Sequence, residues 1–417
     1  MFVCLCKGVS YNKKIKNSIN NMLDNLTYIL FFGVLMILII YAYIKLKFGF
    51  WSIQPVFHIY DISYMIKPPG VIVDSLPKMN KYTNFNKIET ISYSELTETQ
   101  VQRFVNLIKV NYLKNNDNIY SPRIDNISPY FYGLNDKSLI SFYNEDNHII
   151  DTKNGNLITD KKTVGVITSR PIEIVINQET KLRAYYVDYL CVDIFNRKKG
   201  IAQQLIQTHH YNQRHINKNI VVSLFKREDE LTGIVPLCVY STYGFPVKTW
   251  SKPENLSGEY SLIEITPQNS HFLFNFIENM KNNYDILIKT DMSNIIELIK
   301  TKNIYIYTII VDDEIICAYF FRKSCVQVEK GLEVLSCFAS MSNTNDKIFV
   351  QGFKISFWKI ASENHFGFCA IEDISDNNII ISNISIKTQP TIISPTAYFF
   401  YNFGHPTFKS NKVLIIN

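Results

Sequence analysis

The sequence has 417 residues, of which 47% are apolar and 14% aromatic, so it can bury a large core and is not globally disordered. Lys plus Arg number 43 against 37 Asp plus Glu, and this formal charge of +6 is spread along the chain, which argues against nucleic acid as a partner. The eight cysteines form no C-x-x-C pair, and no histidine stands at metal-ligand spacing. We therefore expect neither a metal site nor a disulfide framework.

A long apolar segment lies near the amino terminus. Residues 26–44 contain no charged side chain and are long enough to cross a hydrocarbon core of about 30 Å as a helix. Lys45 and Lys47 follow at once, and the segment lacks a small-residue cleavage site, which disfavours a cleaved signal peptide. A buried core helix is the alternative, but the segment has no polar stripe. We predict an amino-terminal tail over residues 1–25 and a transmembrane helix over residues 26–44.

Lysines flank this segment on both sides. Four precede it within residues 7–16, and Lys45 and Lys47 follow it. The larger number before the segment favours a cytoplasmic amino end.

After Lys47, short strand patterns mix with helical ones. The predicted strands are 163–167, 172–176, 185–192, 220–224, 304–311, 314–321 and 333–340, and the predicted helices are 97–112, 201–212 and 349–363. The order strand, strand, strand, helix, strand occurs near 160–225 and again near 304–404. We therefore predict an α/β body of two similar halves, residues 48–250 and 251–417, divided within the stretch 247–260.

The passage from Tyr185 to Ile206 carries the clearest chemical signal. A half-apolar strand ends near Val192, and a helix with one apolar face begins at Ile201 and Ala202. The turn between them is basic and ends in glycine, with the residues Arg197, Lys198, Lys199 and Gly200. Backbone N–H groups at a helix amino terminus attract anions, glycine permits close approach, and basic side chains add charge. The pattern favours a phosphate site, although basic turns without a ligand are also common.

Two other groups of polar residues are weaker candidates. His209 and His210 are adjacent and point to different helix faces, so with His215 we expect them to be surface or partly buried side chains rather than ligands. Residues 312–314 are acidic and lie between two apolar runs, which predicts a solvated hairpin turn.

Four passages, taken in order, resemble one branch of the GNAT superfamily, the glycylpeptide N-myristoyltransferases. Residues 49–56 (GFWSIQPV) are similar to the family signature F-W-x-T-Q-P-V, and residues 112–118 (YLKNNDN) to its loop Y-V-E-D-D-D-N. The chain then has YLCV at 189–192 and RKKGIA at 197–202, which resemble F-L-C-V and R-S-K-R-V-A. Residues 397–403 (AYFFYNF) and 412–417 (KVLIIN) are similar to Y-Y-L-Y-N-W and to the terminus K-V-G-L-V-L.

The resemblance implies two tandem GNAT-like halves related by a pseudo-twofold axis, preceded here by the transmembrane helix. It also implies roles for individual residues. Phe50 and Trp51 would help bind acyl-CoA, backbone N–H groups of Tyr189 and Leu190 would form an oxyanion hole, and the terminal carboxylate of Asn417 would act as base. The CoA moiety would lie against Cys191, Val192, Arg197, Lys198, Lys199, Gly200, Ile201 and Ala202. The substrate peptide would contact Asp117 and Tyr120.

The implied activity is transfer of a myristoyl group from myristoyl-CoA to the N-terminal glycine of a protein, by a monomer without a metal. Because myristoyl-CoA is cytosolic, this activity places the body in the cytosol as a single-pass membrane protein, against the lysine bias. Two alternatives remain open. One is a GNAT-type transferase for another acyl group or amine, and the other is a non-catalytic membrane-anchored binding protein that retains the fold.

Overall fold

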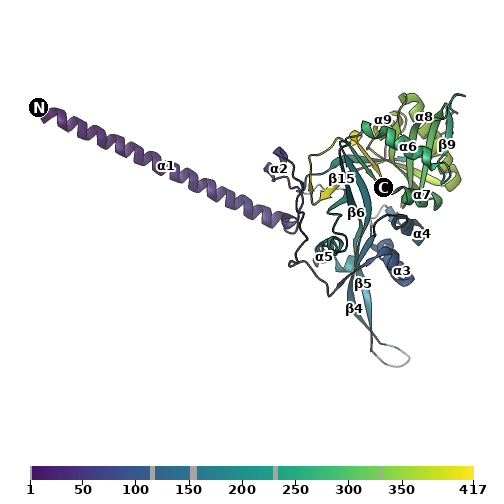
Figure 1. The fold of residues 1–417 in the computed structure, drawn as a ribbon, viewed down its shortest axis with the longest axis horizontal. Helices are drawn as coiled ribbons and strands as arrows, with labels where there is room; N and C mark the ends of the chain where they lie inside the picture. The colour runs from purple at the N-terminus through teal and green to yellow at the C-terminus, as the bar shows by residue number, and fades with distance from the viewer. Residues whose placement is uncertain (1, 113–117, 151–156, 229–232, 329–330) are drawn as a thin grey trace. The chain divides into compact units, whose positions relative to one another are not determined.

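The computed structural model describes residues 2–112, 118–150, 157–228, 233–328 and 331–417 (Figure 1). By their internal contacts, residues 1–54 form one compact unit and residues 55–417 form another.

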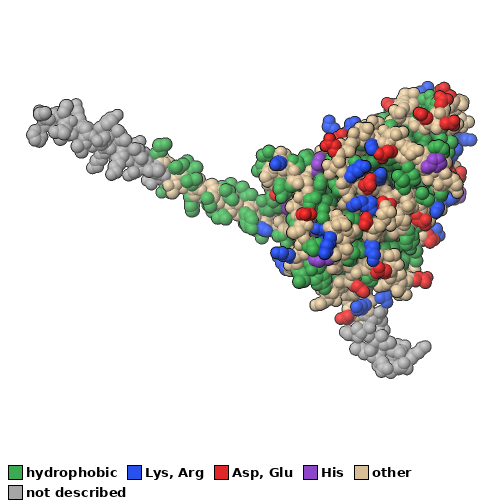
Figure 2. All heavy atoms as spheres, viewed as in Figure 1, with side chains coloured by type: hydrophobic (Ala, Val, Ile, Leu, Met, Phe, Trp, Pro, Cys, Tyr) green, Lys and Arg blue, Asp and Glu red, His purple; other side chains and the backbone are tan. Residues whose placement is uncertain are grey.

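The first unit consists mainly of one helix. Helix α1 spans Phe2–Phe48 and is followed by the short 3-10 helix η1, Trp51–Ile53. Its part Asn25–Phe48 is long and apolar enough to cross a membrane, with a mean hydropathy of 2.5. Figure 2 shows hydrophobic side chains along this part. The predicted segment 26–44 therefore lies within one continuous helix.

The second unit is built on one mixed sheet of 15 strands. Twelve of them follow the order β17-β10-β5-β6-β7-β15-β8-β14-β13-β12-β11-β9, while β2, β3 and β4 pair beside this path and β1 pairs with β16 in a separate ribbon. The strands are β1 Gly70–Val71, β2 Ile88–Ser92, β3 Asn118–Tyr120, β4 Leu139–Ile150, β5 Leu157–Ile176, β6 Thr180–Val192, β7 Val222–Glu228, β8 Cys238–Pro246, β9 Ser261–Glu264, β10 Ile286–Lys289, β11 Ile304–Val311, β12 Glu314–Val328, β13 Leu332–Ser342, β14 Phe366–Glu372, β15 Ile392–Tyr401, β16 Phe403–Gly404 and β17 Val413–Ile416.

Eight α-helices are described in this unit. They are α2 Ile62–Ile66, α3 Glu98–Asn111, α4 Ile124–Ile127, α5 Ile201–Ile216, α6 Ser270–Met280, α7 Met292–Lys300, α8 Asp346–Asn364 and α9 Asn377–Ser385. The 3-10 helices are η2 Tyr93–Glu95, η3 Ser128–Phe131, η4 Ile194–Asn196, η5 Lys281–Asn283 and η6 Ser410–Lys412. Helix α3 begins where the sequence indicates, because Thr97 and Gln100 form a capping box.

A duplicated element order is present, but its first copy differs from the predicted one. The series are β4-β5-β6-α5-β7 and β11-β12-β13-α8-β14, and in each the helix joins two parallel strands. The first copy begins with β4, before residue 160, because the predicted strands 163–167 and 172–176 are both parts of β5. The strand after each series pairs with the other half, because β8 pairs with β14 and β15 pairs with β7. This exchange joins the two halves into one mixed α/β sheet.

Strand β5 differs from the prediction, which divided it into 163–167 and 172–176. It is continuous through Pro171 because that residue lies where one edge of β5 has no partner. Pairing with β4 ends at Ser169, and pairing with β10 begins at Glu173. The missing N–H of Pro171 therefore interrupts no pairing on that edge.

Helices α3 and α5 cover opposite faces of β5 and β6. Val166 and Cys191 pack with Phe104 of α3, whereas Ile167 and Val192 pack with Leu205 of α5. This follows from the alternation of side chains along a strand. Both faces of β6, the strand that leads into the predicted phosphate turn, are thus covered by helices.

Candidate active site

A β-bulge interrupts β6 at Tyr189 and Leu190. Val166 of β5 pairs with Cys191 and Thr168 pairs with Asp188, so one residue of β5, Ile167, lies opposite two residues of β6. Tyr189 has a φ of 47°, in the left-handed region that a tyrosine seldom adopts. The bulge falls at the two residues predicted to form an oxyanion hole.

The same part of β6 separates from its parallel neighbour. Pairing with β7 ends at Val187 and Phe225, and no described strand pairs with that edge of β6 further on. One donor at the bulge is already engaged, because the Tyr189 N–H donates to Asp188 Oδ1 at 2.8 Å. No motif in the sequence distinguishes Asp188.

Aromatic side chains surround the bulge. The Tyr189 ring lies 5.6 Å from the rings of Phe104 and Tyr112, measured between centroids, and its hydroxyl lies 3.5 Å from that of Tyr120. Burial, with the nearby Asp188 carboxylate, raises the pKa of Tyr112, Tyr120 and Tyr189 well above the usual value, so these phenols are neutral at physiological pH. Tyr120 is thus next to the bulge, whereas Asp117, its predicted companion, lies outside the described residues.

The basic turn has a defined geometry. Gly200 is the N-cap of α5 and has a φ of 76°, a conformation that favours glycine. Helix α5 lies close to the sheet, since a Cβ on Gly165 would come within 2.9 Å of Leu205. Ile201 packs on the sheet with Leu205, which directs the first turn of α5 toward the end of β6.

The side chains of this turn make contacts that the sequence did not indicate. Arg197 donates from Nη2 to the Asn111 carbonyl at 2.7 Å and from Nε to the Val192 carbonyl at 3.3 Å. Lys199 donates to Asn196 Oδ1 at 2.7 Å. Arg197 therefore fastens the end of α3 to the turn. A phosphate role for Arg197, Lys198 and Lys199 remains a prediction.

The carboxyl end of the chain is buried, as predicted. Strand β17 pairs in parallel with β10, and the Thr290 N–H donates to the Ile416 carbonyl at 2.9 Å. Ile416 belongs to the same apolar cluster as Phe338 of β13. Asn417 is only 4% exposed.

Strands β7, β8, β14 and β15, which join the two halves of the sheet, contribute a buried polar cluster that no sequence motif indicates. Lys226 of β7 donates to Glu372 of β14 at 3.2 Å, and the Tyr240 hydroxyl of β8 donates to the same carboxylate at 2.5 Å. Lys226 also lies over the ring of Tyr398 of β15. Burial raises the pKa of Glu372, but Lys226, Arg322 and the Tyr240 hydroxyl outweigh this effect and hold the pKa below its usual value.

Arg170 is a second buried cation near the bulge. It is 2% exposed, and its guanidinium lies over the rings of Tyr130 and Tyr186, at 5.3 and 4.9 Å from their centroids. Its Nη1 has no hydrogen-bond partner within the described part of the chain. No local sequence signal identifies this residue, because a lone arginine in a strand resembles a surface side chain.

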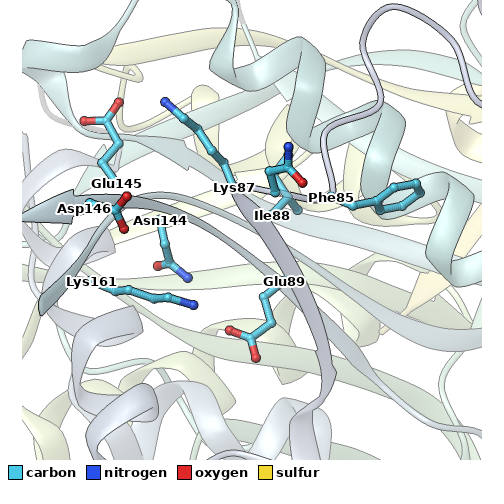
Figure 3. Close-up of a pocket in the computed structure, with 9 residues that line it drawn as sticks. Phe85, Lys87, Ile88, Glu89, Asn144, Glu145, Asp146 and Lys161 are labelled. Atoms are coloured by element: carbon cyan, nitrogen blue, oxygen red, sulfur yellow. The ribbon is translucent and has the colours of Figure 1, made fainter. Parts of the chain in front are cut away.

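A pocket of about 650 Å³ lies between β2 and the β4–β5 hairpin (Figure 3). Its lining carries Lys87, Lys161 and the carboxylates of Glu89, Glu145 and Asp146. None of the predicted site residues lines it. A second pocket, lined by Arg123 and Lys323 among others, also contains none of them.

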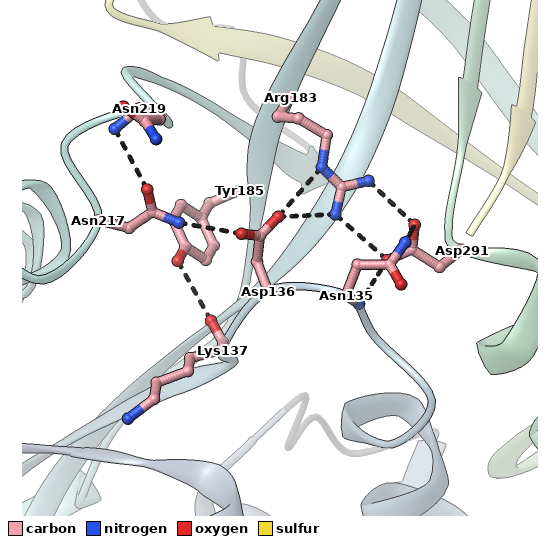
Figure 4. Close-up of polar contacts among 8 residues, drawn as sticks. All are labelled: Asn135, Asp136, Lys137, Arg183, Tyr185, Asn217, Asn219 and Asp291. Carbon is pink, nitrogen blue, oxygen red and sulfur yellow. Dashed lines mark hydrogen bonds and ion pairs between the residues drawn. The ribbon is translucent and has the colours of Figure 1, made fainter.

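An ionic network anchors the start of β6. Arg183 bonds Asp136 at 2.9 Å and Asp291 at 3.0 Å, and Asn217 donates to Asp136 (Figure 4). Asp291 precedes α7 in the second half of the chain, whereas Arg183 lies six residues before Tyr189 in the first. The network thereby fixes the strand that carries the bulge against both halves.

Two expectations about polar residues have different outcomes. Asp312 and Asp313 form the predicted hairpin turn between β11 and β12, with φ of 48° and 64°. The expectation for the histidines is wrong for His209 and His210, which are 2% and 9% exposed. Two serines accommodate His209, since Ser141 and Ser169 lie at 2.7 and 2.9 Å from its ring nitrogens.

Within the described residues, no group of three or more His, Cys, Asp or Glu side chains could hold a metal ion. The six cysteines of the body, Cys191, Cys238, Cys317, Cys325, Cys337 and Cys369, are buried and free. Phe50 and Trp51 belong to the unit of residues 1–54, and their part in binding acyl-CoA stays a prediction.

The fold resembles solved structures of one class of enzyme. A crystal structure of Saccharomyces cerevisiae N-myristoyltransferase with bound myristoyl-CoA matches 87% of this chain and 94% of its own, with a TM-score of 0.66 and 11% sequence identity. A structure of the same enzyme with myristoyl-CoA and inhibitors matches 86% of this chain and 91% of its own, with a TM-score of 0.65 and 12% identity. No family profile and no curated protein matches the sequence.

The body therefore has the mixed α/β fold of the N-myristoyltransferases. The resemblance found in the sequence is confirmed at the level of the fold.

Proposed function

We propose that this chain is a membrane-anchored N-acyltransferase that moves a myristoyl group from myristoyl-CoA to the N-terminal glycine of a protein. The observation that carries the proposal is the bulge at Tyr189 and Leu190, which lies just before a glycine-capped helix amino terminus. Backbone N–H groups at a bulge can stabilise a thioester oxygen, and a helix amino terminus can hold the pyrophosphate of CoA, which supports the proposal. Solved structures with a similar fold contain myristoyl-CoA.

The proposed reaction needs no covalent intermediate on the protein. The glycine amine attacks the thioester carbonyl, and the carbonyl electrons move to its oxygen, where Tyr189 and Leu190 N–H groups stabilise the negative charge. The carbon–sulfur bond then breaks, the nitrogen gives up its second proton to the departing thiolate, and an amide and the CoA thiol remain. Gly200, Ile201 and Ala202 present backbone N–H groups to the phosphates, while Cys191 and Val192 lie beside the CoA.

A base must remove a proton from the incoming ammonium before attack. The terminal carboxylate of Asn417 has this role in the proposal, because the chain end is buried and follows a firmly paired strand. Asp188 competes with the thioester oxygen for the Tyr189 N–H in this proposal, since its carboxylate accepts a hydrogen bond from that group. The thioester oxygen replaces that carboxylate when acyl-CoA binds.

The proposed setting follows from the co-substrate. Helix α1 spans the membrane once through residues 26–44, and the body faces the cytosol, where myristoyl-CoA is available. Phe50 and Trp51 contribute to acyl-CoA binding, and Asp117 and Tyr120 contact the substrate protein. The enzyme acts as a monomer without a metal or nucleic acid.

The test uses the full chain in detergent and a series of acyl-CoAs of graded chain length. We expect myristoyl-CoA to raise the unfolding temperature most, because a ligand stabilises the state that binds it. Mass spectrometry should then show acylation of a peptide that begins with glycine and none of a control peptide with alanine in its place.

Other outcomes point to the alternatives. Stronger protection by a different acyl-CoA, or acylation of another amine, would identify another N-acyltransferase. No protection by any acyl-CoA would leave a non-catalytic binding protein that retains the fold.

A further inference from the structure

A short region of the body exposes an unusual number of apolar side chains. Among large hydrophobic residues exposed within the described part of 55–417, seven of 23 fall between residues 59 and 79. They are Ile59, Ile62, Met65, Ile66, Val71, Val73 and Met79, with Ile62 69% and Ile66 82% exposed. We call these seven side chains the apolar face. Isolated exposed hydrophobic residues are normal, but a group this dense marks an interaction surface.

The backbone beneath the apolar face is held firmly. Asn402 donates to the Val73 carbonyl at 2.7 Å and accepts from the Val73 N–H at 2.8 Å. Arg214, itself 2% exposed, donates to the Asp74 carbonyl at 2.7 Å. Strand β1 pairs with β16, and Tyr64 of α2 packs edge to face on buried Phe57. These contacts hold residues 70–74 and helix α2 on the body, while the seven apolar side chains stay exposed.

Basic side chains border this face. Lys67, Lys78 and Lys81 are exposed and outnumber the one exposed carboxylate of this region, Asp74, while Asp61 is engaged by His58 at 3.1 Å. Apolar side chains flanked by lysines are the pattern of segments that lie in the interface of a membrane with anionic lipids.

The position of the apolar face along the chain favours a membrane, and not another protein, as its binding partner. The apolar helix ends at Phe48, and α2 begins at Ile62. A chain of this length spans at most about 50 Å when fully extended. If α1 crosses the membrane, the start of α2 therefore lies within about 50 Å of the end of the membrane span.

We propose that the apolar face inserts into the interface of the membrane that α1 spans, with the lysines on anionic headgroups. The body is then held on the bilayer by two contacts, the helix and this face, instead of moving freely on a linker. The inference rests on the proposed membrane span and is independent of the acyl-transfer reaction.

The test places tryptophan on the apolar face and, as a matched control, at an equally exposed site elsewhere. Ile66→Trp introduces the probe into α2, and Ile386→Trp places it just after α9, where the native side chain is 78% exposed. Each full-length variant is reconstituted in vesicles that contain roughly one-third phosphatidylserine, with and without bromine on the acyl chains. The quenching of the parent protein is subtracted.

We expect brominated lipid to quench the Ile66→Trp probe and to leave the Ile386→Trp probe unchanged. Replacing Lys67, Lys78 and Lys81 by glutamate should reduce the quenching at position 66. Equal, background-level quenching at both positions would overturn the proposal. Alkaline extraction of the same vesicles reports separately whether α1 spans the membrane.

Discussion

At the scale of single residues, the Tyr189 N–H is the group whose availability matters most for the proposed transfer. In the proposed reaction this group donates to the thioester oxygen, whereas in the structure it donates to Asp188 Oδ1 at 2.8 Å. A carboxylate accepts a hydrogen bond about twice as strongly as a neutral group, so under the proposal Asp188 opposes binding of the thioester.

Asp188→Asn should therefore tighten the binding of acyl-CoA. The amide retains the shape but accepts a weaker hydrogen bond, and a difference of about 1 kcal/mol corresponds to about a fivefold lower dissociation constant. Titration calorimetry with a non-hydrolysable acyl-CoA measures this constant. Asp313→Asn, in the exposed hairpin, controls for the change in net charge. Equal affinity in parent and Asp188→Asn would show that the Tyr189 N–H is not a donor to the thioester.

Gly200→Val tests the phosphate turn. The φ of 76° costs a non-glycine residue about 1–2 kcal/mol, and a Cβ there would lie 3.3 Å from Gln203 Oε1. We expect at least a tenfold weaker affinity for acyl-CoA, with a cooperative unfolding transition retained. Gly258→Val is the matched control, because a Cβ at Gly258 meets no atom within 4 Å. Similar CoA affinity in both variants would mean that the turn is an ordinary connection.

At the scale of elements, helix α5 carries two histidines whose titration is linked to folding. Burial lowers the pKa of His209 to about 3, and burial with nearby Arg214 lowers that of His210 to about 3. The unfolded state binds protons below about pH 6.5, whereas the folded state binds them only near pH 3, so stability falls as the pH drops between these values.

His210→Phe should remove the part of this pH-dependent loss of stability that comes from His210. Phenylalanine has no titratable group but retains an aromatic ring to pack on Tyr401, since the ring centroids of His210 and Tyr401 lie 4.8 Å apart. Between pH 7 and pH 5, the parent should lose about 2 kcal/mol more unfolding free energy than the variant, as measured by urea titration. A parallel pH dependence of parent and variant would show that His210 titrates normally in the folded protein.

Strand β17 provides the second prediction at this scale. Adding Gly-Ser after Asn417 moves the terminal carboxylate beyond its buried position, and we expect transfer to be lost while acyl-CoA still binds. The loss should reach about 10²-fold to 10⁴-fold, the usual contribution of a general base. Asn417→Ala retains the terminal carboxylate and should retain most activity. Parent-like turnover by the extended protein would exclude this carboxylate as the base.

At the scale of the whole molecule, the exchange of β8 and β15 joins residues 55–250 and 251–417 in one sheet. Each half completes its sheet with a strand from the other, and the Lys226–Glu372 pair crosses between them. A chain truncated near residue 250 would lose β14 and β15, which are the two neighbours of β8.

The orientation of the body is a prediction at the same scale. The larger number of lysines before α1 favours an exoplasmic body, but the difference is two residues, and the proposed co-substrate requires the cytosol. Protease added to the cytosolic side of sealed membranes should therefore digest residues 55–417. Protection of the body until detergent is added would rule out myristoyl transfer in the cytosol.

Local signals in the sequence determined several features of this protein. The uncharged run predicted the apolar part of α1, glycine after a basic stretch predicted the start of α5, and the β-branched end predicted buried β17. Each signal is contained within a few residues, because helix ends, turns and strand patterns depend on nearby φ, ψ and polarity.

Only the tertiary structure decided the rest. The bulge at Tyr189 depends on how β5 aligns with β6, and the cluster of Lys226, Tyr240 and Glu372 depends on three strands that meet through the exchange. Register between distant segments determines which polar groups share a buried place, and no local pattern encodes it. For the same reason, the sequence did not predict that His209 and Arg170 are buried in the fold.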